Sequence, residues 1–119
     1  MGKSIVASEC CGAIVDYQDF FLAQVENRAR SKLRVNTRNF ARLLGYFRIP
    51  LVVTLERPVY GKGGVPKDIS AHLTRDAKVF EKDFFDLTKE KRIRDHLARL
   101  KRKQVIMIGC ETWRARPCY

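Results

Sequence analysis

Three positions that could do chemistry each stand at the end of a short apolar run. Asp16 closes residues 12–16, Lys82 follows residues 77–80, and Gly109 closes residues 105–109. If these runs are parallel strands, their carboxyl ends meet at one edge of a sheet, where open α/β sheets bind ligands. A carboxylate and an amine that meet there would shift each other's pKa and share proton transfer. By spacing alone, a simpler interpretation is favoured, because an acid at a strand end is usually a turn or cap residue.

The elements that must position these residues are strands and helices in alternation. Length and β-branched content favour strands for four apolar runs, residues 12–16, 51–55, 77–80 and 105–109. Residues 56–68 hold Pro58, Pro66 and three glycines, which predicts a loop. Strands that alternate with helices predict right-handed βαβ units, and therefore an α/β fold with a Rossmann-like parallel sheet and helices on both faces.

Two amphipathic helices are predicted between the strands. The first is capped by Asn36 and ends before Pro50, and the second is capped by Thr88. Their inner faces are predicted to carry Phe40, Leu43, Leu44 and Phe47 in the first helix, and Ile93, Leu97 and Leu100 in the second. No helix pattern follows residues 105–109, so we expect one domain, residues 1–119, that is truncated after its fourth strand and leaves that strand as an apolar edge.

Composition bounds the class of protein. The chain has 119 residues, 45% of them hydrophobic and 31% charged, which suits one globular domain. No apolar run approaches the roughly 20 residues that span a bilayer, and the first residues lack the pattern of a secretory signal, so we expect a cytoplasmic protein without a membrane contact. The four cysteines match neither a secreted disulfide framework nor a CxxC metal site, and no metal or cofactor is expected.

Four segments in register resemble isochorismatase-like cysteine hydrolases. Residues 13–20 (AIVDYQDF) are similar to the opening motif of that family, and residues 39–54 to its first helix and second strand. Residues 80–82 (FEK) fit the segment that supplies its lysine, and residues 105–112 (VIMIGCET) fit its hydrophobic strand followed by G-x-E-T. The resemblance implies a Rossmann-like fold and hydrolysis of a small amide or related C–N bond.

The resemblance also implies an Asp–Lys–Cys triad, in which Asp16 is the base, Lys82 its electrostatic partner and a cysteine the nucleophile. Backbone N–H groups after the fourth strand would form an oxyanion hole, in the segment that holds Gly109, Glu111, Thr112 and Ala115. The family motif places its cysteine where this chain has Ala115, and Cys110 and Cys118 stand at other positions of the motif. We therefore expect the chain as given to be inactive toward amides.

Two explanations for the departure stay open. In one, Trp113 is the last family-like residue and residues 114–119 come from another reading frame or a wrong gene end. In the other, a genuine short protein keeps the front half of the fold. True isochorismatases work without the cysteine, through acid–base chemistry of the aspartate, so Ala115 alone does not decide between inactive and active.

The positive charge offers a rival function. Lys and Arg number 24 against 13 acidic residues, a net charge of +11, and residues 89–103 hold eight basic and two acidic residues. A non-catalytic protein that binds nucleic acid or another anionic partner is the alternative. No aromatic residues interleave with the basic ones there, so we expect a solvated helix face and no nucleic-acid partner. The partner expected from the resemblance is a small-molecule substrate. We also expect a homo-oligomer that forms through an exposed strand or helices.

Smaller motifs add little chemistry. Residues 61–64 (GKGG) lack the pattern of a phosphate-binding loop and predict a lid over the strand ends. His72 and His96 stand apart from other residue types that bind metals, and His96 is expected to be exposed.

Overall fold

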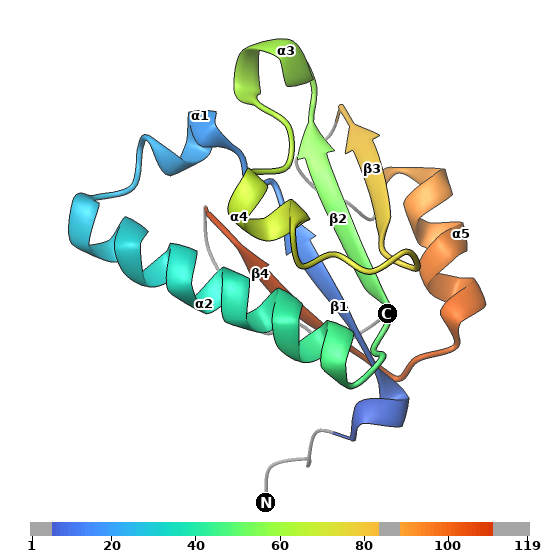
Figure 1. Cartoon of the computed structure of the whole chain (residues 1–119). Helices are drawn as coiled ribbons and strands as arrows, with labels where there is room; N and C mark the ends of the chain where they lie inside the picture. The colour runs from blue at the N-terminus through green and yellow to red at the C-terminus, as the bar shows by residue number, and fades with distance from the viewer. Residues whose placement is uncertain (1–5, 84–88, 111–119) are drawn as a thin grey trace, which may run out of the picture.

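A four-stranded parallel sheet forms the centre of the molecule (Figure 1). The computed structural model describes residues 6–83 and 89–110. Its strands are β1 (Cys10–Val15), β2 (Leu51–Glu56), β3 (Lys78–Lys82) and β4 (Gln104–Gly109), in the order β3-β2-β1-β4. The predicted α/β fold with a parallel sheet is confirmed, and each predicted strand is present.

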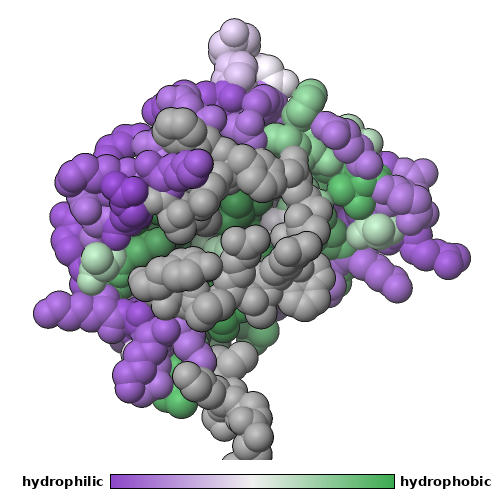
Figure 2. Space-filling view, turned by 180° about the vertical axis from the view of Figure 1, so that it is seen from behind, coloured by the Kyte–Doolittle hydropathy of each residue, from purple (hydrophilic) through white to green (hydrophobic). Residues whose placement is uncertain are grey.

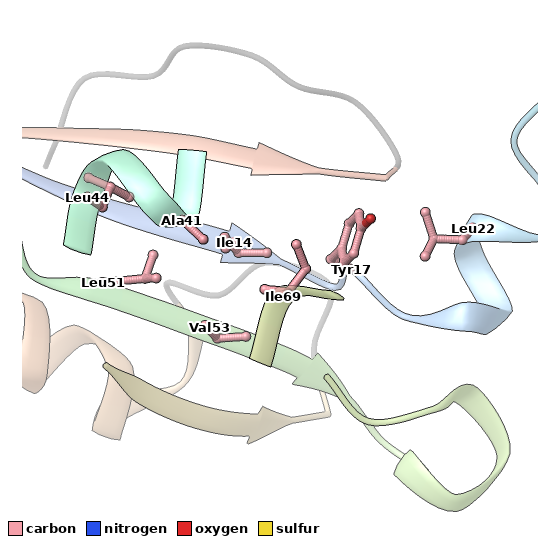
Figure 3. Close-up of a cluster of buried hydrophobic side chains, with 8 residues drawn as sticks. All are labelled: Ile14, Tyr17, Leu22, Ala41, Leu44, Leu51, Val53 and Ile69. Atoms are coloured by element: carbon pink, nitrogen blue, oxygen red, sulfur yellow. The ribbon is translucent and has the colours of Figure 1, made fainter. Parts of the chain in front are cut away.

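One face of the sheet is covered by α2 (Asn27–Tyr46) and the short α4 (Lys67–Ser70) (Figure 1). The core on this face joins residues of β1 and β2 to residues of both helices and of α1 (Asp19–Leu22) (Figure 3). Its members are Ile14, Tyr17, Leu22, Ala41, Leu44, Leu51, Val53 and Ile69. Because parallel strands between helices are buried on both faces, β1 and β2 are almost continuously apolar.

The other face of the sheet carries α5 (Lys91–Leu100). Val53 belongs to the core under α2, so its neighbour Thr54 and the paired Phe80 point to the opposite face. There the rings of Phe80 and His96 lie 5.5 Å apart, and Ile93 is fully buried. Seen from this side, hydrophilic side chains line the flanks of the molecule and hydrophobic ones show between them (Figure 2).

The start of α2 differs from the prediction. The helix begins at Asn27, not after Asn36, and the Glu26 carboxylate caps it by accepting hydrogen bonds from the backbone N–H groups of Arg28 and Ala29. Acidic side chains suit this end because they also face the positive end of the helix dipole.

The inner face of α2 is also partly different. Leu44 is buried as predicted, but Leu43 and Phe47 are 58% and 55% exposed. The buried positions are Thr37, Ala41 and Leu44, because α2 lies close to the sheet and only small residues fit beneath much of its length.

Three further expectations need correction or stay untested. The predicted loop after β2 contains α3 (Val59–Lys62) and α4, with Pro58 and Pro66 at their N-caps, where proline starts a helix and does not break it. His96 is half-buried against Phe80 and not exposed. Thr88 lies outside the described residues, and α5 begins after Glu90.

A short 3-10 turn, η1 (Ala7–Glu9), precedes β1. Within residues 6–83 and 89–110, no helix is long and apolar enough to cross a membrane.

Candidate functional site

A buried ion pair joins the carboxyl ends of β1 and β3. The ammonium Nζ of Lys82, the last residue of β3, donates a hydrogen bond to Asp16 Oδ2 at 2.8 Å. The Asp16 residue is 3% exposed and Lys82 is fully buried. The structure therefore brings together the two residues that the sequence singles out as acid–base candidates, and it does so without solvent between them.

The strand between them completes the anchoring of Asp16. Thr54 on β2 is fully buried, and its hydroxyl donates to Asp16 Oδ1 at 3.2 Å. The backbone N–H of Asp16 donates to the Thr54 carbonyl at 3.0 Å. Asp16 adopts a left-handed conformation with φ of 53°, which aspartate tolerates better than most residues and which turns the chain off the strand. Both carboxylate oxygens are thus held in fixed directions.

Burial decides the acidity of this carboxyl group. Removal of solvent raises the pKa of Asp16 above its ordinary value of 3.8, while Lys82 and the Thr54 hydroxyl partly offset this rise. A carboxylate with a raised pKa is a stronger proton acceptor than one in water. The arrangement can therefore accept a proton from a group placed beside it while Lys82 supplies compensating positive charge.

Gln18 is a buried residue of this edge to which the sequence analysis gave no role. Its side-chain amide donates to the carbonyls of Glu56 at 3.2 Å and Gly63 at 2.8 Å, and it accepts from the Glu56 N–H at 2.8 Å. Lys62 adds an ion pair with Glu56 at 3.0 Å. The predicted lid over the strand ends is thus tied to the end of β2. The glutamine of the AIVDYQDF segment was the available signal.

Of the remaining predicted site residues, the structure describes Gly109, the last residue of β4. Gly109 ends that strand opposite Val15, and a Cβ atom there would lie 2.4 Å from the Val15 carbonyl oxygen. Only glycine fits this close approach. Glu111, Thr112 and Ala115 lie outside the described residues. Within residues 6–83 and 89–110, no three His, Cys, Asp or Glu side chains gather where they could hold a metal ion.

Solved structures of other proteins share this architecture, whereas comparisons of the sequence find no matching family or protein. No protein-family model matches the chain, and no curated protein matches it. The chain is similar to the YcaC gene product of Escherichia coli, an octameric hydrolase of unknown specificity, with a TM-score of 0.79 and 20% identity. It is also similar to YcaC from Pseudomonas aeruginosa (TM-score 0.81, 15% identity) and to the MAR1 ribonuclease from Caenorhabditis elegans (TM-score 0.76, 19% identity).

These likenesses establish the fold. They cover 92%, 91% and 90% of this chain for the P. aeruginosa, E. coli and C. elegans proteins, but only 54%, 54% and 53% of those chains. The chain therefore spans about half the length of its structural neighbours. The parallel α/β architecture that the sequence resemblance implies is thus present in this chain and shared with these proteins.

Proposed function

We propose that this chain carries the acid–base half of the active site of an isochorismatase-like hydrolase, which acts on a small amide or related C–N bond. The observation that carries the proposal is the buried Asp16–Lys82 pair at the carboxyl edge of the sheet, with its 2.8 Å hydrogen bond. Asp16 is the general base and Lys82 its electrostatic partner. A substrate would lie beyond the strand ends, the usual place for ligands in such folds.

In the complete reaction, Asp16 takes the proton of a cysteine thiol. The thiolate attacks the carbonyl carbon, the C–N bond breaks, and the amine leaves with the proton that Asp16 returns. Water then hydrolyses the thioester and releases the acid. Position 115, where the family motif has its cysteine, is alanine in this chain. The acid–base pair is therefore present without its nucleophile, and the chain as given is expected not to turn over amides.

The structural neighbours leave the substrate open. One is described as a hydrolase of unknown specificity, another as a ribonuclease, and the P. aeruginosa protein was solved with covalent acrylamide. Proteins of one fold take different substrates, so the fold itself favours none of them. Acrylamide is nevertheless a useful probe, because it is a small amide that alkylates thiolates.

The experiment restores the nucleophile with Ala115→Cys and follows alkylation by acrylamide, with peptide mass spectrometry locating the modified residue. We expect the new thiol to react faster than Cys118 and to lose this advantage when Asp16→Asn is added. Cys118 of the same molecule is the internal control. Equal rates at both cysteines, or no effect of Asp16→Asn, would contradict the proposed role of Asp16.

We also propose that copies of the chain associate through β4. All six residues of this strand are only partly buried, and β4 is an edge of the described sheet. An unpaired edge is a template for another strand. Light scattering during size-exclusion chromatography tests this. The expected result is a mass of two or more chains, reduced by Met107→Lys on β4, and a monomer at every concentration would contradict it.

A further inference from the structure

The long helix α2 has an unusual charge distribution. Its 20 residues hold six basic side chains and no acidic one. Like charges recur four residues apart, a spacing at which side chains on a helix are neighbours and repel each other. These pairs are Arg28 with Lys32, Arg30 with Arg34, Arg34 with Arg38, and Arg38 with Arg42.

Only part of this charge is compensated inside the molecule. Arg34 pairs with Asp68 at 3.6 Å, and Arg30 donates to the Leu22 carbonyl. Among the described residues, the side chains of Arg28, Lys32 and Arg42 form no ion pair and no hydrogen bond. By contrast, α5 contains the attractive pair of Lys91 with Asp95 at 2.7 Å.

Three of the cations without a partner, Arg28, Lys32 and Arg42, lie in one line on the outer side of α2, where they are exposed. The inner side carries Thr37, Ala41 and Leu44, so residues half a turn away face outward. Those residues are Arg28, Lys32, Val35, Asn39, Arg42 and Tyr46. Arg28 and Arg42 are 14 residues apart, which is about 21 Å along a helix. Figure 1 shows α2 at the front of the molecule, lying across one face of the sheet.

Two exposed aromatic residues, Tyr46 and Phe47, lie at the C-terminal end of this line of cations. The Tyr46 residue is 81% exposed, and Phe47 beside it is 55% exposed. Their rings meet edge to face with centroids 5.0 Å apart, so the Tyr46 ring is braced while one of its faces remains accessible. Residues 89–103 have the positive charge but no aromatic residue among the basic ones.

We infer that the outer face of α2, from Arg28 to Tyr46, binds single-stranded nucleic acid. Phosphates would lie along Arg28, Lys32 and Arg42, and a base would stack on the Tyr46 ring. Proteins that bind single strands combine these two elements, a basic track for the backbone and an exposed aromatic ring for the bases. Two copies of the chain are not expected to meet through this face, because the cations of the two α2 helices would repel each other. The inference does not depend on the proposed hydrolase site.

Fluorescence anisotropy with labelled oligouridine and oligoadenine, in a series of salt concentrations, tests the inference. The first variant is Arg28→Gln/Lys32→Gln/Arg42→Gln. Its matched control, Lys89→Gln/Arg99→Gln/Lys101→Gln, removes the same number of charges within α5 and beside its two ends. We expect the α2 variant to reduce the slope of log affinity against log salt by about 2, because each lost phosphate contact removes about 0.7. The control should leave the slope nearly unchanged.

A third variant, Tyr46→Leu, distinguishes binding of nucleic acid from binding of an acidic protein. We expect about tenfold weaker binding of oligoadenine with an unchanged salt slope, because stacking is lost and no charge is removed. Circular dichroism checks that α2 stays helical in each variant. Equal losses in the α2 variant and its α5 control would overturn the inference, as would absence of binding at low salt. The inference would also be overturned if polyglutamate bound as tightly as oligoadenine and Tyr46→Leu did not change the affinity. The partner of α2 would then be an acidic protein.

Discussion

Lys82 and Asp16 are 66 residues apart in sequence, and their side chains meet at 2.8 Å across an intervening strand. They belong to the ends of β3 and β1, which are not neighbours in the sheet, because β2 lies between them. Thr54 lies on this middle strand, and its hydroxyl donates a hydrogen bond to the other carboxylate oxygen of Asp16, Oδ1. The pair therefore links three strands and also concentrates charge at the edge where ligands are expected.

The first prediction concerns the dependence of stability on this pair. Lys82→Met leaves the Asp16 carboxylate buried and without its partner, which typically costs about 3–5 kcal/mol of the free energy of unfolding. Urea unfolding measures the loss. Lys62→Met is the matched control, because Lys62 pairs with Glu56 at 3.0 Å but remains partly solvated. It should cost no more than about 1 kcal/mol, and similar losses in both variants would contradict the special role of burial.

A second prediction follows from the acidity of Asp16. Burial raises the pKa of this carboxyl group above 3.8, so the folded protein binds the proton more tightly than the unfolded chain does. The stabilising contribution of protonation is present below 3.8 and is lost as the pH rises through the folded pKa. The free energy of unfolding of the wild type should therefore fall relative to Asp16→Asn as the pH rises from below 3.8 toward neutrality.

Urea unfolding of both proteins at a series of pH values measures this difference, and NMR of the Asp16 carboxyl carbon follows the titration directly. Thr54→Val should raise the pKa of Asp16 further, because the hydroxyl that stabilises the charged form is removed. A wild type that instead gains stability relative to Asp16→Asn over this range would show that attraction by Lys82 outweighs burial.

The third prediction concerns His96, which packs against Phe80 on the opposite face of the sheet. Burial lowers the pKa of His96 below its ordinary 6.5, and the positive charges of Arg99 and Lys78 lower it further. The folded protein therefore holds the neutral ring, and the stability that this gives above 6.5 is lost as the pH falls. Relative to His96→Gln, the wild type should lose stability as the solution is acidified.

The His96 ring proton followed by NMR gives the titration itself. Lys78→Gln should raise the pKa of His96, because one of the positive charges that oppose its protonation is removed. The wild-type protein under the same conditions is the reference. An unchanged titration of His96 in the Lys78→Gln protein would remove the electrostatic part of this explanation.

The strands were predictable from sequence and the face of α2 was not, for one physical reason. Parallel strands covered on both sides are uniformly apolar, so their positions are visible in the sequence. On α2, however, the packing is close enough that a Cβ at Gly12 would lie 2.5 Å from a methyl group of Leu44. The helix therefore turns Thr37 and Ala41 inward, while larger apolar residues such as Leu43 remain exposed. Hydrophobicity alone does not reveal this choice.

The candidate site was predictable to the same partial degree. Asp16 and Lys82 follow apolar runs, and the parallel topology brings such positions to one edge. Thr54 was not singled out, because a threonine inside an apolar run fits an ordinary strand residue. Its role depends on β2 lying between β1 and β3, and the strand order is a tertiary property.

The last prediction tests the close approach of β1 and β4 at the site. In Gly109→Ala the new Cβ would lie 2.4 Å from the carbonyl oxygen of Val15, and backbone atoms, unlike a flexible side chain, do not move aside easily. We expect a loss of about 1–3 kcal/mol in the free energy of unfolding, the usual cost of overpacking, measured in urea. Gly64→Ala is the matched control, because nothing lies within 4 Å of its Cβ position. This substitution should be neutral or should stabilise the protein by up to about 1 kcal/mol, because alanine lowers the conformational entropy of the unfolded chain. If Gly109→Ala were as harmless as Gly64→Ala, β4 would not lie against β1 at this register, and the end of β4 would not belong to the candidate site that we propose for Asp16 and Lys82.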